Sequence, residues 1–153
     1  MLPRPRKRKL VIHADGAIRD DPPSTGVGVV IRDGEGQILD WISEANEGRL
    51  TCNEAEYAAL IRALEAARDY HPREVHFYLD SLIVVNQMRG RFAVRSPALR
   101  SLNGQARRLA RRFRQVTFTH VPRKRNRLAD ALANEAVDRA RTRRKQNDRP
   151  RVG

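Results

Sequence analysis

Four carboxylates stand at the boundaries of the strands and helices that the sequence predicts. Asp15 ends a first β-rich run just before Gly16, Asp80 ends a later one, and Glu56 and Asp130 fall near the beginnings of two helices. Active sites of open sheets lie outside strand ends, where loops and helix termini meet. Four carboxylates gathered there repel one another unless cations neutralise them. Such oxygen ligands suit Mg²⁺, and two Mg²⁺ ions together can hydrolyse a phosphodiester.

Each acid alone also has an ordinary structural interpretation. A single Asp at the end of a strand is commonly a turn residue, and an acid in a first helical turn is stabilised by the helix dipole. The combination of four such acids with clustered cations is what favours a metal site that acts on nucleic acid.

The chain carries 31 basic and 18 acidic side chains, a net charge of +13. The basic residues gather in the segments 1–9, 98–115, 123–127 and 139–153, which together hold 22 basic residues and one acid. The remainder of the chain holds 9 basic and 17 acidic residues. A mildly acidic body with cationic segments is typical of a nucleic-acid-binding protein. The alternative is a solvated surface, and for the arginines of 98–115 the two interpretations weigh equally.

Length and composition narrow the class further. The 153 residues suffice for one domain with a core of its own, and 40% of them are hydrophobic. No apolar run approaches the roughly 20 residues that span a bilayer, so we expect no membrane partner. Cys52 is the single cysteine, which excludes a disulfide framework or a multi-cysteine zinc site. With no apolar signal-peptide core after the basic N-terminus, we expect a cytoplasmic protein. We also expect it to be a monomer.

The pattern along the chain predicts three strands followed by alternating helices and strands. We expect strands at 9–15, 26–32, 37–43, 74–79 and 116–121, and helices at 53–68, 81–88, 98–113 and 127–141. Thr51 and Asn53 are candidate N-cap residues of the first helix. The order predicts an α/β fold with a five-stranded mixed sheet flanked by helices. The domain occupies 9–141, between a disordered basic arm at 1–8 and a disordered basic tail at 142–153.

Four motifs resemble those of type 1 ribonuclease H, in the family's order and at similar spacing. They are H-A-D-G-A at 13–17, T-C-N-E-A-E-Y-A-A-L at 51–60, F-Y-L-D-S at 77–81 and H-V-P-R-K-R-N-R-L-A-D-A-L-A at 120–133. The resemblance covers about residues 9–138. It implies a ribonuclease H-like fold and an endonuclease that cuts the RNA strand of RNA/DNA hybrids, leaves 5′-phosphates and uses two Mg²⁺ ions, for which Mn²⁺ can substitute.

The resemblance also implies roles for individual residues. The catalytic and metal-binding acids would be Asp15, Glu56, Asp80 and Asp130. Gly16 would lie near an RNA 2′-hydroxyl, Thr51 would contact a DNA phosphate, and Asn53 would contact the nucleic acid. The chain departs from the family at Cys52 and Leu82, where members often carry Asn and Gln, so fewer minor-groove hydrogen bonds are expected.

The short loop before Asp130 is a further departure, because many members carry a histidine in a longer loop there. We expect His120 to be a partly buried residue at the end of a strand. Arg123 follows Pro122, whose φ is fixed, and is the better candidate to hold the scissile phosphate.

Other functions stay open at the level of sequence. One is a noncatalytic nucleic-acid-binding module, or ribosome-associated binding through the basic tails. Another is a nuclease of the same superfamily that acts on double-stranded RNA or DNA junctions, so double-stranded RNA remains a second candidate partner.

Overall fold

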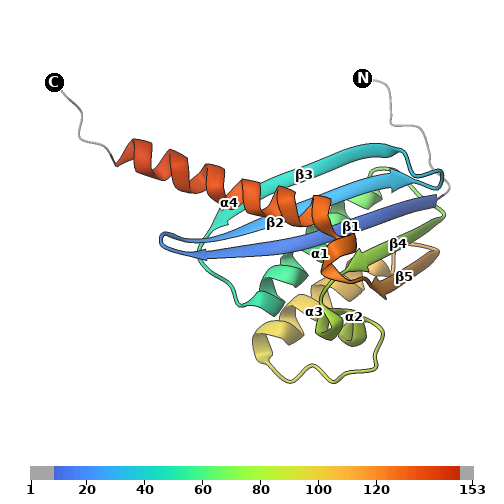
Figure 1. Cartoon of the computed structure of the whole chain (residues 1–153). Helices are drawn as coiled ribbons and strands as arrows, with labels where there is room; N and C mark the ends of the chain where they lie inside the picture. Colours follow the sequence, from blue (N-terminus) through green and yellow to red (C-terminus); the bar gives the residue numbers. More distant parts are fainter. Residues whose placement is uncertain (1–8, 149–153) are drawn as a thin grey trace.

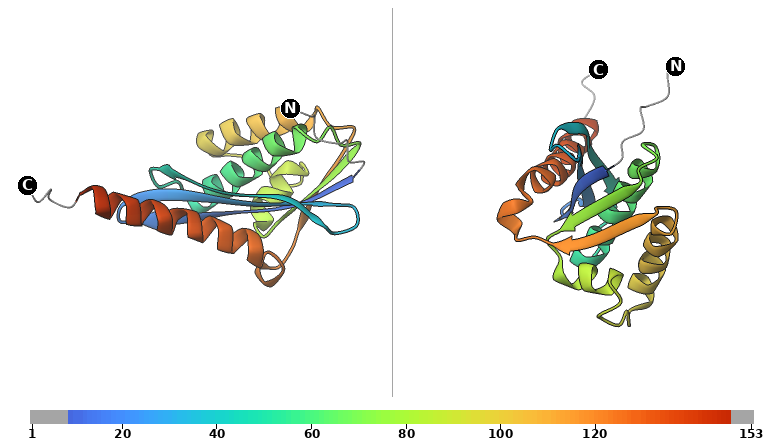
Figure 2. Two further views of the ribbon diagram at one scale, coloured as in Figure 1. Left: turned by 90° about the horizontal axis from the view of Figure 1, so that it is seen from above. Right: turned by 90° about the vertical axis from the view of Figure 1, so that its right-hand side faces the viewer.

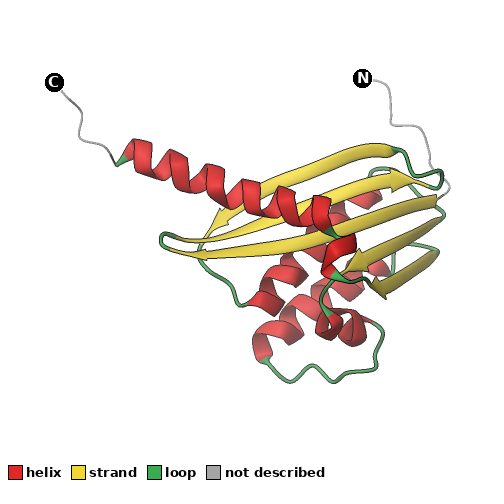
Figure 3. Ribbon diagram, in the orientation of Figure 1, coloured by secondary structure: helices red, strands yellow, loops and turns green. Residues whose placement is uncertain are grey.

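The computed structural model describes residues 9–148 as one sheet with helices on both faces (Figures 1 and 3). The strands are β1 (Lys9–Asp20), β2 (Pro23–Asp33), β3 (Ile38–Glu47), β4 (Glu74–Leu79) and β5 (Gln115–His120). The helices are α1 (Cys52–Arg68), α2 (Leu82–Met88), α3 (Pro97–Ala110) and α4 (Arg127–Asn147), with a 3₁₀ turn, η1 (Arg123–Arg125), before α4.

The sheet has the order β3-β2-β1-β4-β5. Strands β1, β2 and β3 pair antiparallel, whereas β4 lies parallel to β1 and β5 parallel to β4. Helices α1, α2 and α3 lie on one side of the sheet and α4 lies on the other, as Figure 2 shows. The predicted five-stranded mixed sheet with flanking helices is therefore confirmed.

The main core lies between the sheet and α1. The predicted apolar face of α1 is buried at Tyr57, Leu60, Leu64 and Ala67, whereas Ile61 is only partly buried. Strands β1 and β4 supply Leu10, Ile12 and Phe77 to the same cluster. Among the helices of residues 9–148, none combines the length and apolar composition that crossing a bilayer requires.

Strand β1 is longer than predicted. We expected it to stop at Gly16, but it continues to Asp20 and pairs with β2 along its whole length. Gly16 is there because α1 packs directly on it: a Cβ at this position would lie 2.5 Å from the carbonyl oxygen of Ala55. The glycine marks a close approach between helix and strand rather than the end of a strand.

Helix α4 is also longer than predicted. It was expected to end at residue 141, but it continues through the first part of the segment predicted as a disordered tail and ends at Asn147. The stretch 139–147 has neither Gly nor Pro, and Arg139 pairs with Glu135 one turn earlier at 3.2 Å. The predicted arm at 1–8 and the end of the tail at 149–153 lie outside the described residues.

Candidate active site

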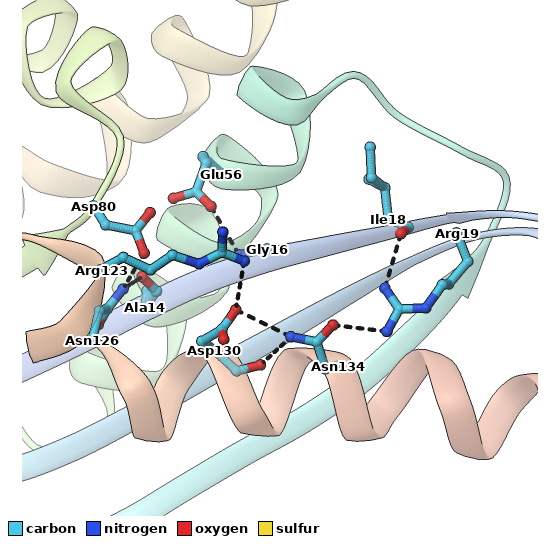
Figure 4. Close-up of polar contacts among 10 residues, drawn as sticks. All are labelled: Ala14, Gly16, Ile18, Arg19, Glu56, Asp80, Arg123, Asn126, Asp130 and Asn134. Carbon is cyan, nitrogen blue, oxygen red and sulfur yellow. Dashed lines mark hydrogen bonds and ion pairs between the residues drawn. The ribbon is translucent and has the colours of Figure 1, made fainter.

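Three of the four predicted acids converge at the centre of the sheet. Asp15, Glu56 and Asp80 each offer a carboxylate oxygen, and these oxygens lie within 4.8 Å of one another. They line a hollow of about 340 Å³ together with Gly16, Cys52, Asn53 and Arg123. Figure 4 shows Glu56, Asp80 and Asp130 arranged around Gly16 and the Arg123 side chain.

The position of Asp15 corrects the sequence prediction. Asp15 is inside β1, opposite Gly28 of β2, and not at the end of the strand. The parallel pairing of β1 with β4 ends at His13 and Tyr78, so Asp15 and Asp80 each lie two residues beyond the last pair. The two carboxylates therefore meet where the parallel strands separate, which is where open sheets place their active sites.

Helix α1 brings Glu56 to this point. Thr51 caps the helix by accepting a hydrogen bond from Glu54 N, and the Glu54 side chain accepts one from Thr51 N, which together form a capping box. The absence of a side chain at Gly16 lets α1 approach β1, and Gly16 N donates to Glu56 Oε1 at 3.1 Å. The expected N-cap role of Thr51 is confirmed, whereas Asn53, the other candidate, is the second residue of the helix and does not cap it.

Asp130 lies at the edge of the three-acid cluster and is held differently. Its Oδ1 accepts a hydrogen bond from Asn134 Nδ2 at 3.1 Å and lies 3.7 Å from Arg123 Nη2. Arg19 donates to Asn134 Oδ1 at 2.8 Å and also pairs with Asp138 at 3.4 Å. The Arg19 guanidinium thereby fixes which way the Asn134 amide faces, and the amide orients Asp130 (Figure 4).

Burial and mutual repulsion raise the pKa of the two innermost acids. Burial, hydrogen bonding to Glu56 and the charge of Glu56 together raise the pKa of Asp15 to about 11. Burial also raises the pKa of Glu56, against the hydrogen bonds from Asp15 and Gly16 N that lower it. Their residues are only 4% and 7% exposed. Removing a carboxylate from water disfavours its charged form unless a cation compensates.

The donor set fits a divalent cation. It is made of carboxylate oxygens, and Glu56 Oε2 is buried without a hydrogen-bond partner within residues 9–148. A buried oxygen left unpaired is costly, and a hard cation satisfies it. Asp15, Glu56 and Asp80 would hold the metal, with Asp130 beside them.

Asn126, which the sequence did not point to, donates hydrogen bonds to Asp80 and to the backbone next to Asp15. It is 1% exposed, and its Nδ2 donates to Ala14 O at 3.0 Å and to Asp80 Oδ2 at 3.3 Å. The sequence did not point to Arg19 and Asn134 either. The N-cap position of Asn126 was readable from the chain, but its partners are 46 and 112 residues away in sequence.

Two of the three predicted substrate-binding residues line the hollow. Gly16 and Asn53 line the hollow, whereas Thr51 is exposed at the start of α1 and is not among the lining residues. Arg123 lines the hollow with an 80% exposed side chain. His120 ends β5, as predicted, but it is exposed rather than partly buried.

The fold and this acidic centre define the ribonuclease H-like class of proteins. Residues 13–136 match the sequence family described as reverse transcriptase-like. The ribonuclease HI of Halobacterium salinarum is 44% identical over 133 residues, which are 84% of this chain and 65% of that protein. The bifunctional protein Rv2228c of Mycobacterium tuberculosis is 42% identical over 132 residues, and there the match covers 86% of this chain but only 36% of the relative. The chain thus spans less than two thirds of the length of these curated relatives.

Solved structures give the same assignment. The N-terminal RNase H domain of Rv2228c, solved as a fusion with maltose-binding protein, superposes with a TM-score of 0.82 at 41% identity and covers 89% of this chain and 98% of that one. LC11-RNase H1 in complex with an RNA/DNA hybrid gives a TM-score of 0.79 at 37% identity, covering 86% and 98%. The chain belongs to the type 1 ribonuclease H family.

Proposed function

We propose that this chain hydrolyses the RNA strand of RNA/DNA hybrids in a reaction that needs divalent metal ions. The observation that carries the proposal is the cluster of Asp15, Glu56 and Asp80, with oxygens within 4.8 Å of one another beside an exposed arginine. Family membership agrees with it, and LC11-RNase H1, whose solved chain is matched over 98% of its length, was solved with an RNA/DNA hybrid. One chain supplies all four acids, so the proposed reaction needs no residue from a second copy and a monomer suffices.

The residues of the chain divide the work. Asp15, Glu56 and Asp80 would hold two Mg²⁺ ions together with Asp130, and Mn²⁺ could replace Mg²⁺. Such ions, when bound, activate the attacking water and neutralise charge on the leaving oxygen, which leaves 5′-phosphate products. Arg123 binds the scissile phosphate and offsets its developing charge, because a guanidinium stays protonated.

Substrate contacts follow from the elements around the hollow. Gly16 lines the hollow, and an RNA 2′-hydroxyl in the hollow lies near its backbone. Asn53, at the start of α1, faces the same hollow. Thr51, the exposed N-cap two residues before Asn53, contacts a phosphate of the DNA strand through its hydroxyl.

The experiment that tests the proposal compares four labelled duplexes: RNA/DNA, RNA/RNA, DNA/DNA and a DNA duplex with one ribonucleotide. We expect cleavage of the RNA strand of the hybrid in Mg²⁺ or Mn²⁺, poor cleavage in Ca²⁺, and none in EDTA. Ca²⁺ prefers longer distances and more ligands than this compact site offers. The matched control is Asp80→Asn, and undiminished cleavage in EDTA would overturn the proposal.

A noncatalytic binding module is the second candidate, and the buried acids argue against it. Keeping Asp15 and Glu56 together in the interior is unfavourable, and a module that only binds nucleic acid has no use for that arrangement. Hybrid binding without cleavage in any of the three metals would favour it. Cleavage of RNA/RNA alone would point to the double-stranded RNA alternative.

A further inference from the structure

A second hollow lies on the α4 side of the sheet, and its walls are cationic. It has a volume of about 180 Å³ and is bounded by β1, β2, η1 and the first turn of α4. Its charged lining residues are Arg32, Lys124, Arg125 and Arg127. Within the described part of the chain, none of these four side chains forms an ion pair with a carboxylate. Four such cations around one hollow attract an anion.

The same hollow receives the N-terminus of a long helix. Arg127, Leu128 and Ala129 are the first residues of α4, which has 21 residues, and all three line the hollow. Asn126 is the N-cap, but its side chain makes no capping hydrogen bond. The first backbone N–H groups of α4 therefore lack the usual side-chain acceptor, and their dipoles favour an anion at this place.

Two buried polar atoms of the lining are without a partner among residues 9–148. They are His13 Nδ1 and Asn126 Oδ1. Asn126 is 1% exposed, so its free oxygen faces no bulk water. Leaving such atoms unpaired is unfavourable. A neutral imidazole can carry its hydrogen on Nδ1 and donate to an anion, whereas the Asn126 oxygen only accepts and needs a donor such as a water molecule bound with that anion.

We propose that this hollow binds a phosphate group, and that the phosphate belongs to the backbone of the nucleic acid strand lying across the acids. The second part rests on the proposed function. The two hollows share the wall formed by η1: Arg123 lines the acidic one, whereas Lys124 and Arg125 line the cationic one. Asn126 lines the cationic hollow and connects it to the acidic one, because its Nδ2 donates to Asp80 Oδ2 while its Oδ1 has no hydrogen-bond partner among residues 9–148.

The position sets this pocket apart from the contact expected at Thr51. Thr51 begins α1, which packs on the opposite side of the sheet from α4 (Figure 2). A nucleic acid strand bound at the acids would thus also contact the cationic pocket on the α4 side, independently of any contact at the start of α1. The pocket extends the substrate footprint by one phosphate.

The first test removes two of the cations. The pocket variant is Lys124→Gln/Arg127→Gln. The control is Arg68→Gln/Arg73→Gln, which removes the same charge at the end of α1 and just before β4. All four side chains are exposed. Affinity for a short RNA/DNA hybrid without terminal phosphates is measured by fluorescence anisotropy in EDTA, so cleavage does not enter. We expect about ten-fold weaker binding for the pocket variant. The slope of log affinity against log salt should fall by about 0.9 for each phosphate that the variant no longer neutralises.

The second test locates the ligand through the His13 ring, which stacks on Tyr78 at 5.0 Å. Its NMR signals are followed while inorganic phosphate is added, and then while the hybrid is added. We expect phosphate to shift these signals in the wild type but not in the pocket variant, and the hybrid to displace the phosphate.

The outcomes separate the pocket from the function. Equal weakening in the pocket variant and its control would reduce the effect to general charge and overturn the proposal. Phosphate that binds but is not displaced by the hybrid would make free phosphate the ligand and overturn the strand assignment. Because none of these readouts needs turnover, a failed cleavage assay leaves them interpretable, and their failure leaves the cleavage result standing.

Discussion

The acids on β1 and α1 and the acid on α4 are held in opposite ways. Asp15 and Glu56 are almost fully buried, and their positions follow from backbone packing at Gly16. Asp130 has a 28% exposed side chain, oriented by Asn134 on one side and Arg123 on the other. The first arrangement is unfavourable without a cation, whereas Asp130 is partly exposed and has polar partners of its own. We infer that the buried acids define where the metal sits and that Asp130 contributes less to holding it.

The largest effect is expected from the cluster of Asp15, Glu56 and Asp80. Asp15→Asn and Asp80→Asn each remove a carboxylate that would bind the metal, and we expect the cleavage rate to fall at least about a hundred-fold. Hybrid binding should persist or tighten, because repulsion between the acids and phosphates is reduced. Single-turnover cleavage and anisotropy measure the two quantities separately.

Asp130→Asn tests directly whether Asp130 differs from the buried acids. We expect it to reduce the rate less than Asp15→Asn does, since Asp130 stands outside the group of three oxygens. An equal or larger loss of cleavage rate would show that Asp130 contributes as much to the reaction as the buried acids do.

The next largest effect is expected at Arg123, the cation that lines the hollow with the acids. Arg123→Ala should lose at least about ten-fold in kcat, because the guanidinium that offsets phosphate charge is removed. His120→Ala should keep most of the rate, since His120 is exposed at the end of β5 and does not line the hollow. The reverse ranking, with a pH–rate limb near 6.5 that vanishes in His120→Ala, would give the catalytic role to the histidine.

A smaller effect is expected at Asn134, which donates a hydrogen bond to Asp130. Asn134→Ala should lower the rate about three- to ten-fold, the amount that one hydrogen bond to a charged group supports. The loss should shrink at high Mg²⁺, because a misoriented ligand weakens metal affinity rather than removing it. Titration calorimetry with Mg²⁺ tests this without turnover, and Glu65→Gln on the exposed face of α1 is the control. An unchanged Mg²⁺ affinity would reduce Asn134 to a structural residue.

The sequence predicted the fold and the acids because both leave local marks. β-rich runs indicated the five strands, and helical periodicity indicated the helices. The N-cap of α1 was visible at Thr51. The end of β1 was predicted wrongly, because a glycine that admits a helix looks the same in sequence as one that ends a strand. Asn126 and the contact of Arg19 with Asn134 were missed, because their partners are brought together only by the sheet.

The smallest predicted effect is on stability, and it follows from the raised pKa of Asp15. The ordinary pKa of the carboxyl is 3.8, and in the fold it is about 11. Between these values the native state holds a proton that the unfolded chain has released, so metal-free stability is greatest below the lower pKa and falls as pH rises through the window. Glu56, whose pKa is also raised, acts in the same direction.

In EDTA we therefore expect the melting temperature of the wild type to fall between pH 5 and pH 9. Asp15→Asn carries no such charge, so its melting temperature should depend less on pH and should exceed that of the wild type at pH 8 by about 5 °C. Mg²⁺ should reverse the order by stabilising only the wild type, since binding to the folded state raises its stability. Differential scanning calorimetry over this pH range gives the measurement. Parallel curves for the wild type and Asp15→Asn would mean that Asp15 is not strained by its burial, and the contrast with Asp130 would then disappear.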